Sequence, residues 1–260
     1  MRRSYLSATL GATLGALLAL VLAVPSSANA QLTEDFHRTV PITPDGRVSL
    51  ENINGNVQLT GWDRAEVQID AVKSAADQER LNEARIEVDV ATDSVRIRTR
   101  YPEGQHNHRM ASVRYELHVP RNVRLDRIEL VNGSLNVGQV SGEVDASVVN
   151  GSLHARNLAG RSVLATVNGS LEAVFTSLNH VTDIRLRSVN GSIDLGLPES
   201  PNAELRASTV SGSIQTDFPL QVKGQVVGKN LSGTLGNGGT HIEMSNVNGS
   251  IHISPSRGSL

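Results

Sequence analysis

The chain contains no cysteine and few aromatic residues. Without cysteine it forms no disulfide, no thiolate metal site and no cysteine nucleophile, and it carries no lipidated cysteine anchor. Aromatic residues make up 3% of the sequence. This disfavours a carbohydrate groove lined by ring faces, since such faces supply much of the contact area in recognition sites. We interpret the single tryptophan, Trp62, as a packing residue rather than a sugar platform.

Long basic runs are also missing. The chain has 24 basic and 26 acidic side chains, a net charge of −2. A mildly acidic protein has no electrostatic reason to bind nucleic acid or an anionic membrane surface. We therefore predict neither of these partners.

Residues 1–30 have the pattern of a cleavable export signal. Arg2 and Arg3 form a short basic start, residues 10–24 are apolar, and Ala28-Asn29-Ala30 provides the small residues that precede cleavage. The apolar stretch is shorter than the ~20 residues that cross a bilayer. We predict removal after Ala30, no integral membrane span in residues 31–260, and a periplasmic or extracellular product. The arginine pair fits both the general and the twin-arginine export routes.

A five-residue motif, V-N-G-S-[LI], recurs through the second half of the chain. The copies begin at Val131, Val149, Val167, Val189, Val210 (with serine in place of asparagine) and Val247. Their glycines are 18, 18, 22, 21 and 37 residues apart. A degenerate copy at 231–235 divides the last gap, and half-copies lie at Gly142 and Gly160. A period near 20 residues is typical of repeat architectures.

Apolar residues recur at even offsets inside each copy. In the first copy these are Val131, Leu135 and Val137, and a period of two indicates a strand with one buried face. An 18-residue unit accommodates two strands of about 6 residues joined by bends. One such coil cannot bury its apolar face alone, so the copies must stack. We predict an all-β, single-chain β-solenoid in which Val131 and its equivalents belong to the buried face.

Stacked coils would align the motif residues as ladders along the axis. The predicted ladder residues are Asn132, Gly133, Asn150, Gly151, Asn168, Gly169, Asn190, Gly191, Gly212, Asn248 and Gly249. Asparagine and glycine both tolerate the positive φ that a bend requires. Glycosylation of the Asn-Gly-Ser triplets is a weaker interpretation. Calcium binding of the β-roll type is disfavoured, because it needs an aspartate after the glycines.

The segment before the repeats has a different pattern. Strands are expected at 47–50, 55–60, 66–72 and 113–119, with a hairpin over 86–99. One helix is expected at 74–84, with Ser74 as its N-cap and Asp77 in the capping-box position. We predict that residues 31–125 form a β-rich N-terminal cap over the open end of the solenoid. Residues 126–253 would form the solenoid repeats and residues 254–260 a disordered tail.

The pattern resembles a family of bacterial envelope proteins with β-strand repeats of unknown function that are described as candidate adhesins. The matching stretches are Gly61-Trp62-Asp63, Leu117-His118-Val119-Pro120, Leu195-Gly196-Leu197-Pro198 and Gly236-Asn237-Gly238-Gly239. The resemblance covers most of residues 31–260. It implies a right-handed, parallel β-helix-like solenoid, and the family has no established catalytic residues to carry over.

The sequence contains none of the short motifs that carry catalytic mechanisms, such as H-E-x-x-H, G-x-S-x-G or a phosphate loop. His106 and His108 are the best metal-like pair, but a zinc site usually needs three or four ligands. Glycoside hydrolysis needs two carboxyls about 5–10 Å apart. We find no set at matched repeat offsets among the solenoid carboxylates, which are Glu143, Asp145, Glu172, Asp183, Asp194, Glu204 and Asp217. We predict no enzyme activity, no metal and no cofactor.

The sequence favours an exported, non-enzymatic envelope protein, adhesin-like or a scaffold, that presents a regular polar surface to an envelope protein or a glycan. A polysaccharide-binding or polysaccharide-active β-helix is the alternative, and a cluster of acidic side chains on one face would favour it. A purely structural role would require the terminal coil, expected at 246–253, to pair with another chain.

Overall fold

Strands account for most of the chain in the computed structural model, which describes residues 31–102, 110–220 and 229–256. Residues 31–260 gather into one compact unit. The described residues of that unit form twenty strands and one short helix, so the all-β prediction is confirmed. In the described part of the chain, no helix is both long and apolar enough to cross a membrane.

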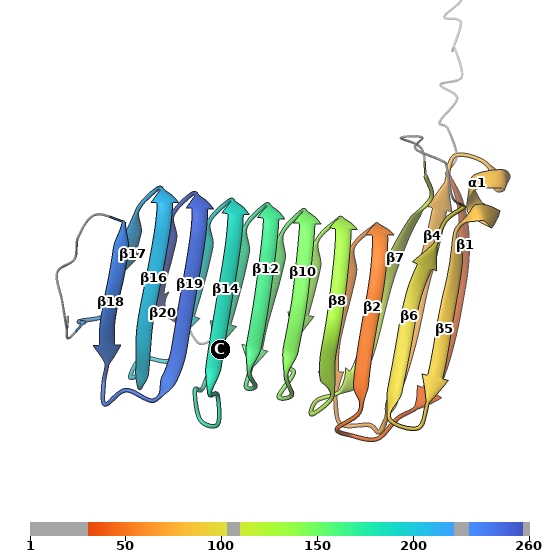
Figure 1. Cartoon of the computed structure of the whole chain (residues 1–260). Coiled ribbons are helices and arrows are strands. Elements are labelled where there is room, and N and C mark those ends of the chain that lie inside the picture. The colour runs from red at the N-terminus through yellow and green to blue at the C-terminus, as the bar shows by residue number, and fades with distance from the viewer. Residues whose placement is uncertain (1–30, 103–109, 221–228, 257–260) are drawn as a thin grey trace, which may run out of the picture. The chain divides into compact units, whose positions relative to one another are not determined.

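Ten strands form the sheet at the front of Figure 1, which we call the front sheet. They are β2 (Arg47–Asn54), β5 (Arg85–Ala91), β6 (Ser94–Arg100), β8 (Arg124–Asn132), β10 (Val144–Asn150), β12 (Ser162–Asn168), β14 (Asp183–Asn190), β16 (Ala203–Ser211), β18 (Asn230–Leu235) and β19 (Thr240–Asn248). Their order in space is β18-β16-β19-β14-β12-β10-β8-β2-β6-β5.

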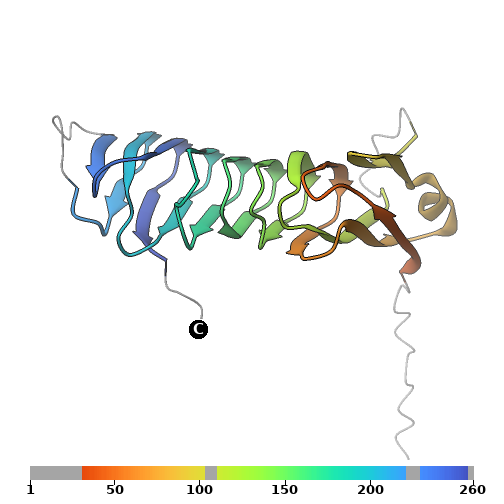
Figure 2. The ribbon, with the colours of Figure 1, turned by 90° about the horizontal axis from the view of Figure 1, so that it is seen from below.

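Ten further strands form the rear sheet. They are β1 (Leu32–Pro41), β3 (Val57–Trp62), β4 (Glu66–Ala75), β7 (Ser112–Pro120), β9 (Leu135–Gly138), β11 (Leu153–Leu158), β13 (Leu171–Phe175), β15 (Ile193–Leu197), β17 (Ile214–Thr216) and β20 (Ile251–Pro255). Their order is β1-β4-β7-β3-β9-β11-β13-β15-β20-β17. Seen from below, the two sheets form two layers along the unit (Figure 2).

Each coil consists of one front strand, a bend at Asn-Gly-Ser and one rear strand. β10 pairs in parallel with β12 so that Asn150 lies beside Asn168, and β11 pairs with β13 so that Leu153 lies beside Leu171. In Figure 1 the front strand of each coil runs upward and its rear strand downward as the coils advance from right to left, which is a right-handed winding. The predicted β-solenoid, with like residues stacked on like, is confirmed.

The order of the coils in space differs from their order in the sequence. β19 pairs with both β14 and β16, and β20 pairs with both β15 and β17. The copy that begins at Val247 is therefore an inner coil, and the prediction that residues 246–253 form the terminal coil is wrong. The last coil is the one formed by β16 and β17.

The degenerate copy at 231–235 does not form a coil. It lies on β18, which pairs antiparallel with β16 on the outer side of the last coil. Gly236, Gly238 and Gly239 all have positive φ, a conformation that glycine adopts at little cost. They turn the chain back from β18 into β19, so the front sheet ends in an antiparallel edge strand.

At the other end of the unit, antiparallel strands replace coils. β1 pairs with β4, and β4 pairs with β7. β5 and β6 form the hairpin predicted over residues 86–99. β2 and β3 already have the geometry of a coil, since they pair in parallel with β8 and β9 and the bend between them contains Gly55 at φ +119°.

The helix α1 (Gln78–Glu83) is shorter than predicted and begins later. Asp77 is its N-cap, because the Asp77 side chain accepts a hydrogen bond of 3.0 Å from the backbone N of Arg80. This bond satisfies one of the open N–H groups at the helix start. Ser74 lies in β4 and pairs with Ser112. The alternation of half-buried and buried residues in β4 continues to Ala75, through the first residues of the predicted helix.

The core lies between the two sheets. The Leu or Ile of the motif is fully buried in five coils, at Leu135, Leu153, Leu171, Ile193 and Ile251. The valine that opens each motif was expected on the same buried face, and this is wrong: Val131 and its equivalents at 149, 167, 189 and 247 are 38–40% exposed.

The glycine explains why the valine faces outward. Gly133 and its equivalents at 151, 169, 191 and 249 have φ between +139° and +150°, so the strand alternation stops at the bend and restarts after it. Leu130 faces inward, Val131 and Asn132 face outward, and Leu135 faces inward again. A count of even offsets across the bend therefore gives the wrong face for the valine.

Candidate functional site: a polar groove on the rear sheet

The predicted asparagine ladder runs along the bend between the sheets. Each side-chain amide donates a hydrogen bond of 2.9–3.0 Å to the side-chain oxygen of the asparagine in the neighbouring coil. The bonds run from Asn132 to Asn54, from Asn150 to Asn132, from Asn168 to Asn150, from Asn190 to Asn168 and from Asn248 to Asn190. The amides bind one another, so the ladder holds the coils in register.

The motif glycines stack beside the asparagines. An added Cβ at Gly151 would overlap the carbonyl oxygen of Gly133, and one at Gly169 would overlap that of Gly151. The same holds at Gly191, Gly249 and Gly212, each against the glycine of the neighbouring coil. Because these positions also have positive φ, glycine is required by both space and backbone conformation. The ladder residues thus shape the solenoid, and the side chains available to a ligand lie elsewhere.

One side chain of each coil projects from the rear sheet three residues after the motif glycine. In spatial order these residues are Asn136, His154, Glu172, Asp194, His252 and Gln215. They lie in register on neighbouring parallel strands, which are about 4.8 Å apart. We call them the polar row.

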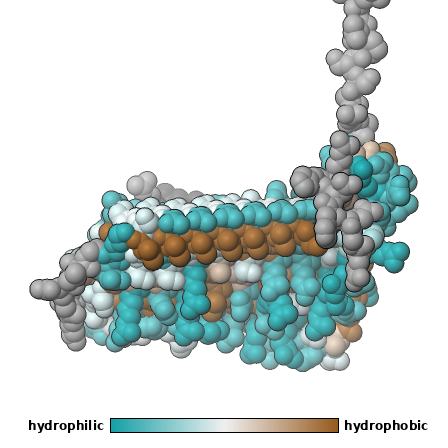
Figure 3. Space-filling view, turned by 45° about the horizontal axis from the view of Figure 1, so that its top comes forward, coloured by the Kyte–Doolittle hydropathy of each residue, from teal (hydrophilic) through white to brown (hydrophobic). Residues whose placement is uncertain are grey.

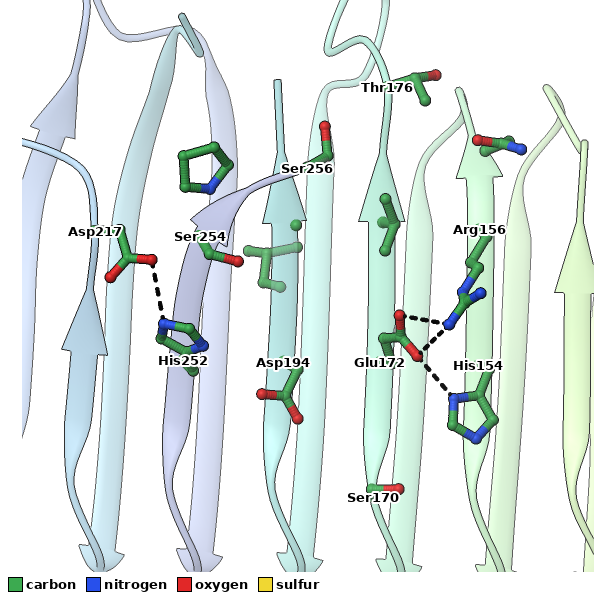
Figure 4. Close-up of a pocket in the computed structure, with 15 residues that line it drawn as sticks. His154, Arg156, Ser170, Glu172, Thr176, Asp194, Asp217, His252, Ser254 and Ser256 are labelled. Atoms are coloured by element: carbon green, nitrogen blue, oxygen red, sulfur yellow. Dashed lines mark hydrogen bonds and ion pairs between the residues drawn. The ribbon is translucent and has the colours of Figure 1, made fainter. Parts of the chain in front are cut away.

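A groove of about 880 Å³ follows the polar row over β11, β13, β15 and β20 and reaches Asp217, the residue after β17 (Figure 4). Four members of the row, from His154 to His252, line it, together with Arg156 and Asp217. Hydroxyl groups of Ser170, Thr176 and Ser254 add hydrogen-bonding positions. The groove combines regular strand spacing with a different side chain at each step.

Glu172 is the most extensively bonded carboxylate of the groove. Arg156 Nη2 donates to both of its oxygens, at 2.9 and 3.0 Å, and His154 Nδ1 lies 3.0 Å from Oε2. Partial burial raises the pKa of Glu172, but the hydrogen bonds and charges of Arg156 and His154 outweigh burial and hold the pKa below its ordinary value of 4.5. Glu172 is therefore ionised at neutral pH.

Asp194 occupies the middle of the groove without a cationic partner among the described residues. Its hydrogen bond comes from Ser192 Oγ at 3.0 Å. On its far side, His252 Nε2 lies 3.5 Å from Asp217 Oδ2. The groove is lined by one arginine, two histidines and three carboxylates, so its carboxylates outnumber its arginine.

The expectation that no carboxylates share a repeat offset is wrong. Glu172 and Asp194 both lie three residues after a motif glycine and are in register on β13 and β15. The glycines at 169 and 191 are 22 residues apart, so a count with a fixed 18-residue period misses the match. A count from each glycine would have found it. Of the other carboxylates, Asp217 also lines the groove, whereas Asp145, Asp183 and Glu204 lie on front strands.

A carboxylate pair on adjacent strands has roughly the 5–5.5 Å separation that retaining glycoside hydrolases use. Such an enzyme also needs a carboxyl that stays protonated to act as the acid. The lowered pKa of Glu172 removes it from that role. What the groove can do is accept hydrogen bonds from hydroxyl, amide or ammonium groups of a ligand and donate through Arg156.

Of the other sequence candidates, Trp62 is described and does not line the groove. His106 and His108 lie outside the described residues. Among residues that are described, no group of three or more His, Asp or Glu side chains is arranged to hold a metal ion. Trp62 is half-buried at the end of β3, where its Nε1 donates to the Glu66 carbonyl at 2.9 Å and Arg64 lies 4.8 Å above its ring.

Solved structures similar to the chain are remote in sequence. A candidate cell adhesion protein from Clostridium sporogenes is 13% identical, with 86% of this chain and 100% of that chain covered and a TM-score of 0.47. A candidate adhesin from Bacteroides fragilis is 11% identical, with coverages of 85% and 97% and a TM-score of 0.35. A candidate lipid binding protein from Parabacteroides distasonis is 11% identical, with coverages of 85% and 95% and a TM-score of 0.29.

No curated protein matches the chain. The family described as Toastrack DUF4097 matches residues 39–254, a range that begins in β1 and ends in β20. The match therefore includes β2 to β19, nearly all of β20, and every lining residue of the groove except Pro255 and Ser256. This agrees with the resemblance to the envelope β-strand-repeat proteins, and the chain belongs to the Toastrack DUF4097 family.

Proposed function

We propose that the protein is an exported, non-enzymatic binding protein of the bacterial cell envelope, adhesin-like or a scaffold, which recognises an envelope protein or glycan through the polar groove. One observation carries the proposal. Six outward side chains of differing chemistry lie in register on a sheet whose coils are held by the asparagine and glycine ladders. The export step rests on the signal pattern of residues 1–30.

The geometry suits an elongated ligand. The groove crosses the four strands β11, β13, β15 and β20, and its groups are held on a sheet, so they are positioned before the ligand arrives. Preorganisation of this kind lowers the entropic cost of binding. Asp194 has free acceptor capacity, and Glu172 is already neutralised by Arg156. The expected contact is therefore a ligand hydroxyl or ammonium group on Asp194, beside a ligand acceptor on Arg156.

Co-sedimentation with isolated bacterial cell envelopes tests the proposal. Purified residues 31–260, which form one compact unit, should sediment with the envelopes. If protease treatment of the envelopes abolishes binding, the partner is a protein, and if binding persists, the partner is a glycan or lipid. If the protein does not bind the envelopes at all, the proposal is contradicted.

Charge-neutral variants locate the binding surface. Glu172→Gln with Asp194→Asn keeps the side-chain shapes and removes both charges, and we expect binding at least about tenfold weaker, because hydrogen bonds to charged groups contribute about 1.5–3 kcal/mol each. The matched control is Asp145→Asn with Glu204→Gln, two exposed carboxylates of the front sheet. Equal binding by both double variants would show that the groove is not the binding surface.

The register of Glu172 and Asp194 also favours a second candidate, a polysaccharide-active β-helix. That candidate predicts release of reducing ends from envelope polysaccharide, and loss of the release in either single variant, Glu172→Gln or Asp194→Asn. The binding proposal predicts no release by the wild-type protein.

A further inference from the structure

A row of exposed valines runs along the bend on the side opposite the core. We call it the valine row: Val131, Val149, Val167, Val189, Val247 and Val210, in spatial order. Five of the valines are 38–40% exposed, and Val210 at the end is 65% exposed. Figure 3 shows a continuous hydrophobic band with a hydrophilic row along one side. Ile53 continues the row on β2, because Asn54 and Asn132 are in register.

The residue immediately before each valine faces the core, and there the chemistry is reversed. In spatial order these buried residues are Asn52, Leu130, Val148, Thr166, Ser188, Asn246 and Thr209. Five of these seven buried positions are polar, whereas the residues that follow them are six exposed valines and the half-buried Ile53. The same comparison is repeated from coil to coil. Because the outward position is apolar even where the buried one is polar, burial does not explain the apolar row.

Stacking within the row explains part of its composition. β-Branched residues suit strands, and each inner valine is shielded by its neighbours, as the higher exposure of Val210 shows. Threonine is also β-branched, and at these positions it would expose less apolar surface than valine does. The row contains no threonine. The asparagine and serine rows on its bend side carry no charge, and the outward row on its front-sheet side carries charge only at Glu129 and Arg187. The result is a straight uncharged strip about 24 Å long, from five strand spacings of about 4.8 Å.

We propose that the valine row is a contact surface for a second copy of this chain. An in-register ladder of β-branched residues forms dry, interdigitated contacts with an identical ladder, and a second copy has the same spacing by construction. A two-fold axis would place the two rows antiparallel and self-complementary. The uncharged asparagine and serine rows would approach the partner without burying a charge. This contact is independent of the groove and of the proposed function.

Sedimentation equilibrium of residues 31–260 over a concentration series up to the solubility limit tests the proposal. The wild type should show a monomer–dimer equilibrium, and Val149→Thr/Val167→Thr/Val189→Thr should weaken dimerisation at least about tenfold, because threonine keeps the β-branched shape and loses apolar surface. The matched control is Val163→Thr/Val174→Thr, half-buried valines on the outer faces of the front and rear sheets, which should dimerise like the wild type. A monomeric wild type, or equal dimerisation of all three proteins, overturns the proposal.

A cross-linking experiment covers the case in which the triple variant does not fold. The chain has no cysteine, so Val167→Cys introduces a single thiol on the row, and Gln58→Cys places one at an exposed position of the rear sheet. With a mild oxidant at equal protein concentration, Val167→Cys should form disulfide-linked dimers at least about tenfold faster, since a disulfide requires close Cβ atoms. Equal rates for the two variants overturn the proposal.

Discussion

The bend and the polar row lie three residues apart in every coil, yet they differ in how they use repetition. At the bend, glycine stands in all six motif copies and asparagine in five, and each residue contacts its own equivalent in the next coil. In the polar row, the equivalent positions hold asparagine, histidine, glutamate, aspartate and glutamine. Positions that build the fold are copied, and the positions that we propose as ligand contacts vary.

The valine row adds a third case to this comparison. It is copied like the bend, but it faces outward like the polar row. An exposed surface that repeats at every strand spacing can match only a partner with the same repeat, and another copy of the chain is such a partner. Variation between coils therefore points to a ligand, and repetition at the surface points to self-association.

Replacement of a bend glycine should have the largest effect. Gly169→Ala forces positive φ on alanine and places its Cβ against the Gly151 carbonyl. We expect a loss of about 2–4 kcal/mol in the free energy of unfolding, measured by urea denaturation. Gly138→Ala is the control, because the nearest atom to an added Cβ there is 4.0 Å away, and it should change stability by less than about 0.5 kcal/mol. A similar loss in both variants would refute the distinction between the positions.

Replacement of a bend asparagine should have an intermediate effect. Asn168→Ala removes one bond to Asn150 and one from Asn190. Water replaces part of the loss because the ladder is solvent-exposed, so we expect a cost of about 1 kcal/mol, read as a shift in the urea midpoint at constant m-value. Asn136→Ala, in the polar row, is the comparison variant and should cost less than about 0.5 kcal/mol. If Asn136→Ala proves the more costly, the ladder does not hold the coils together.

The repeat made the solenoid predictable from the sequence, because each coil carries its own bend and its own buried Leu or Ile. The hydrogen bonds between asparagines also follow from the motif, because parallel stacking of the coils places equivalent residues side by side. The face of Val131 could not be predicted from period two, because Gly133 at φ +141° interrupts the strand alternation. Periodicity is reliable only within a strand.

Two further features depend on contacts that no local pattern encodes. β19 lies between β14 and β16, which reverses the expected order of the last two coils. The motif sequence does not indicate which of these coils comes last in space. The longer loop between β13 and β14 changes the sequence spacing of Glu172 and Asp194 but not the stacking of their strands. A count with a fixed period therefore misses that the two residues are in register. Asp77 took the N-cap because β4 extends to Ala75, and the strand alternation prevailed over the capping-box pattern.

Removal of the Glu172 charge should have the smallest effect on stability. It tests whether the polar row contains a preformed charged cluster. The pKa of Glu172 is lowered in the folded protein, so its ionised form stabilises the fold above the unfolded value near 4.5, and this contribution is lost as the pH falls below 4.5 through the folded pKa. The free energy of unfolding of the wild type should exceed that of Glu172→Gln by less than about 1 kcal/mol at pH 7. The difference should shrink as urea titrations are repeated from pH 4.5 downward, with Glu204→Gln, an exposed front-sheet carboxylate, as the reference. A difference that grows on acidification would mean that Arg156 and His154 do not stabilise the Glu172 carboxylate, and the polar row would then contain no preformed charged cluster for a ligand to meet.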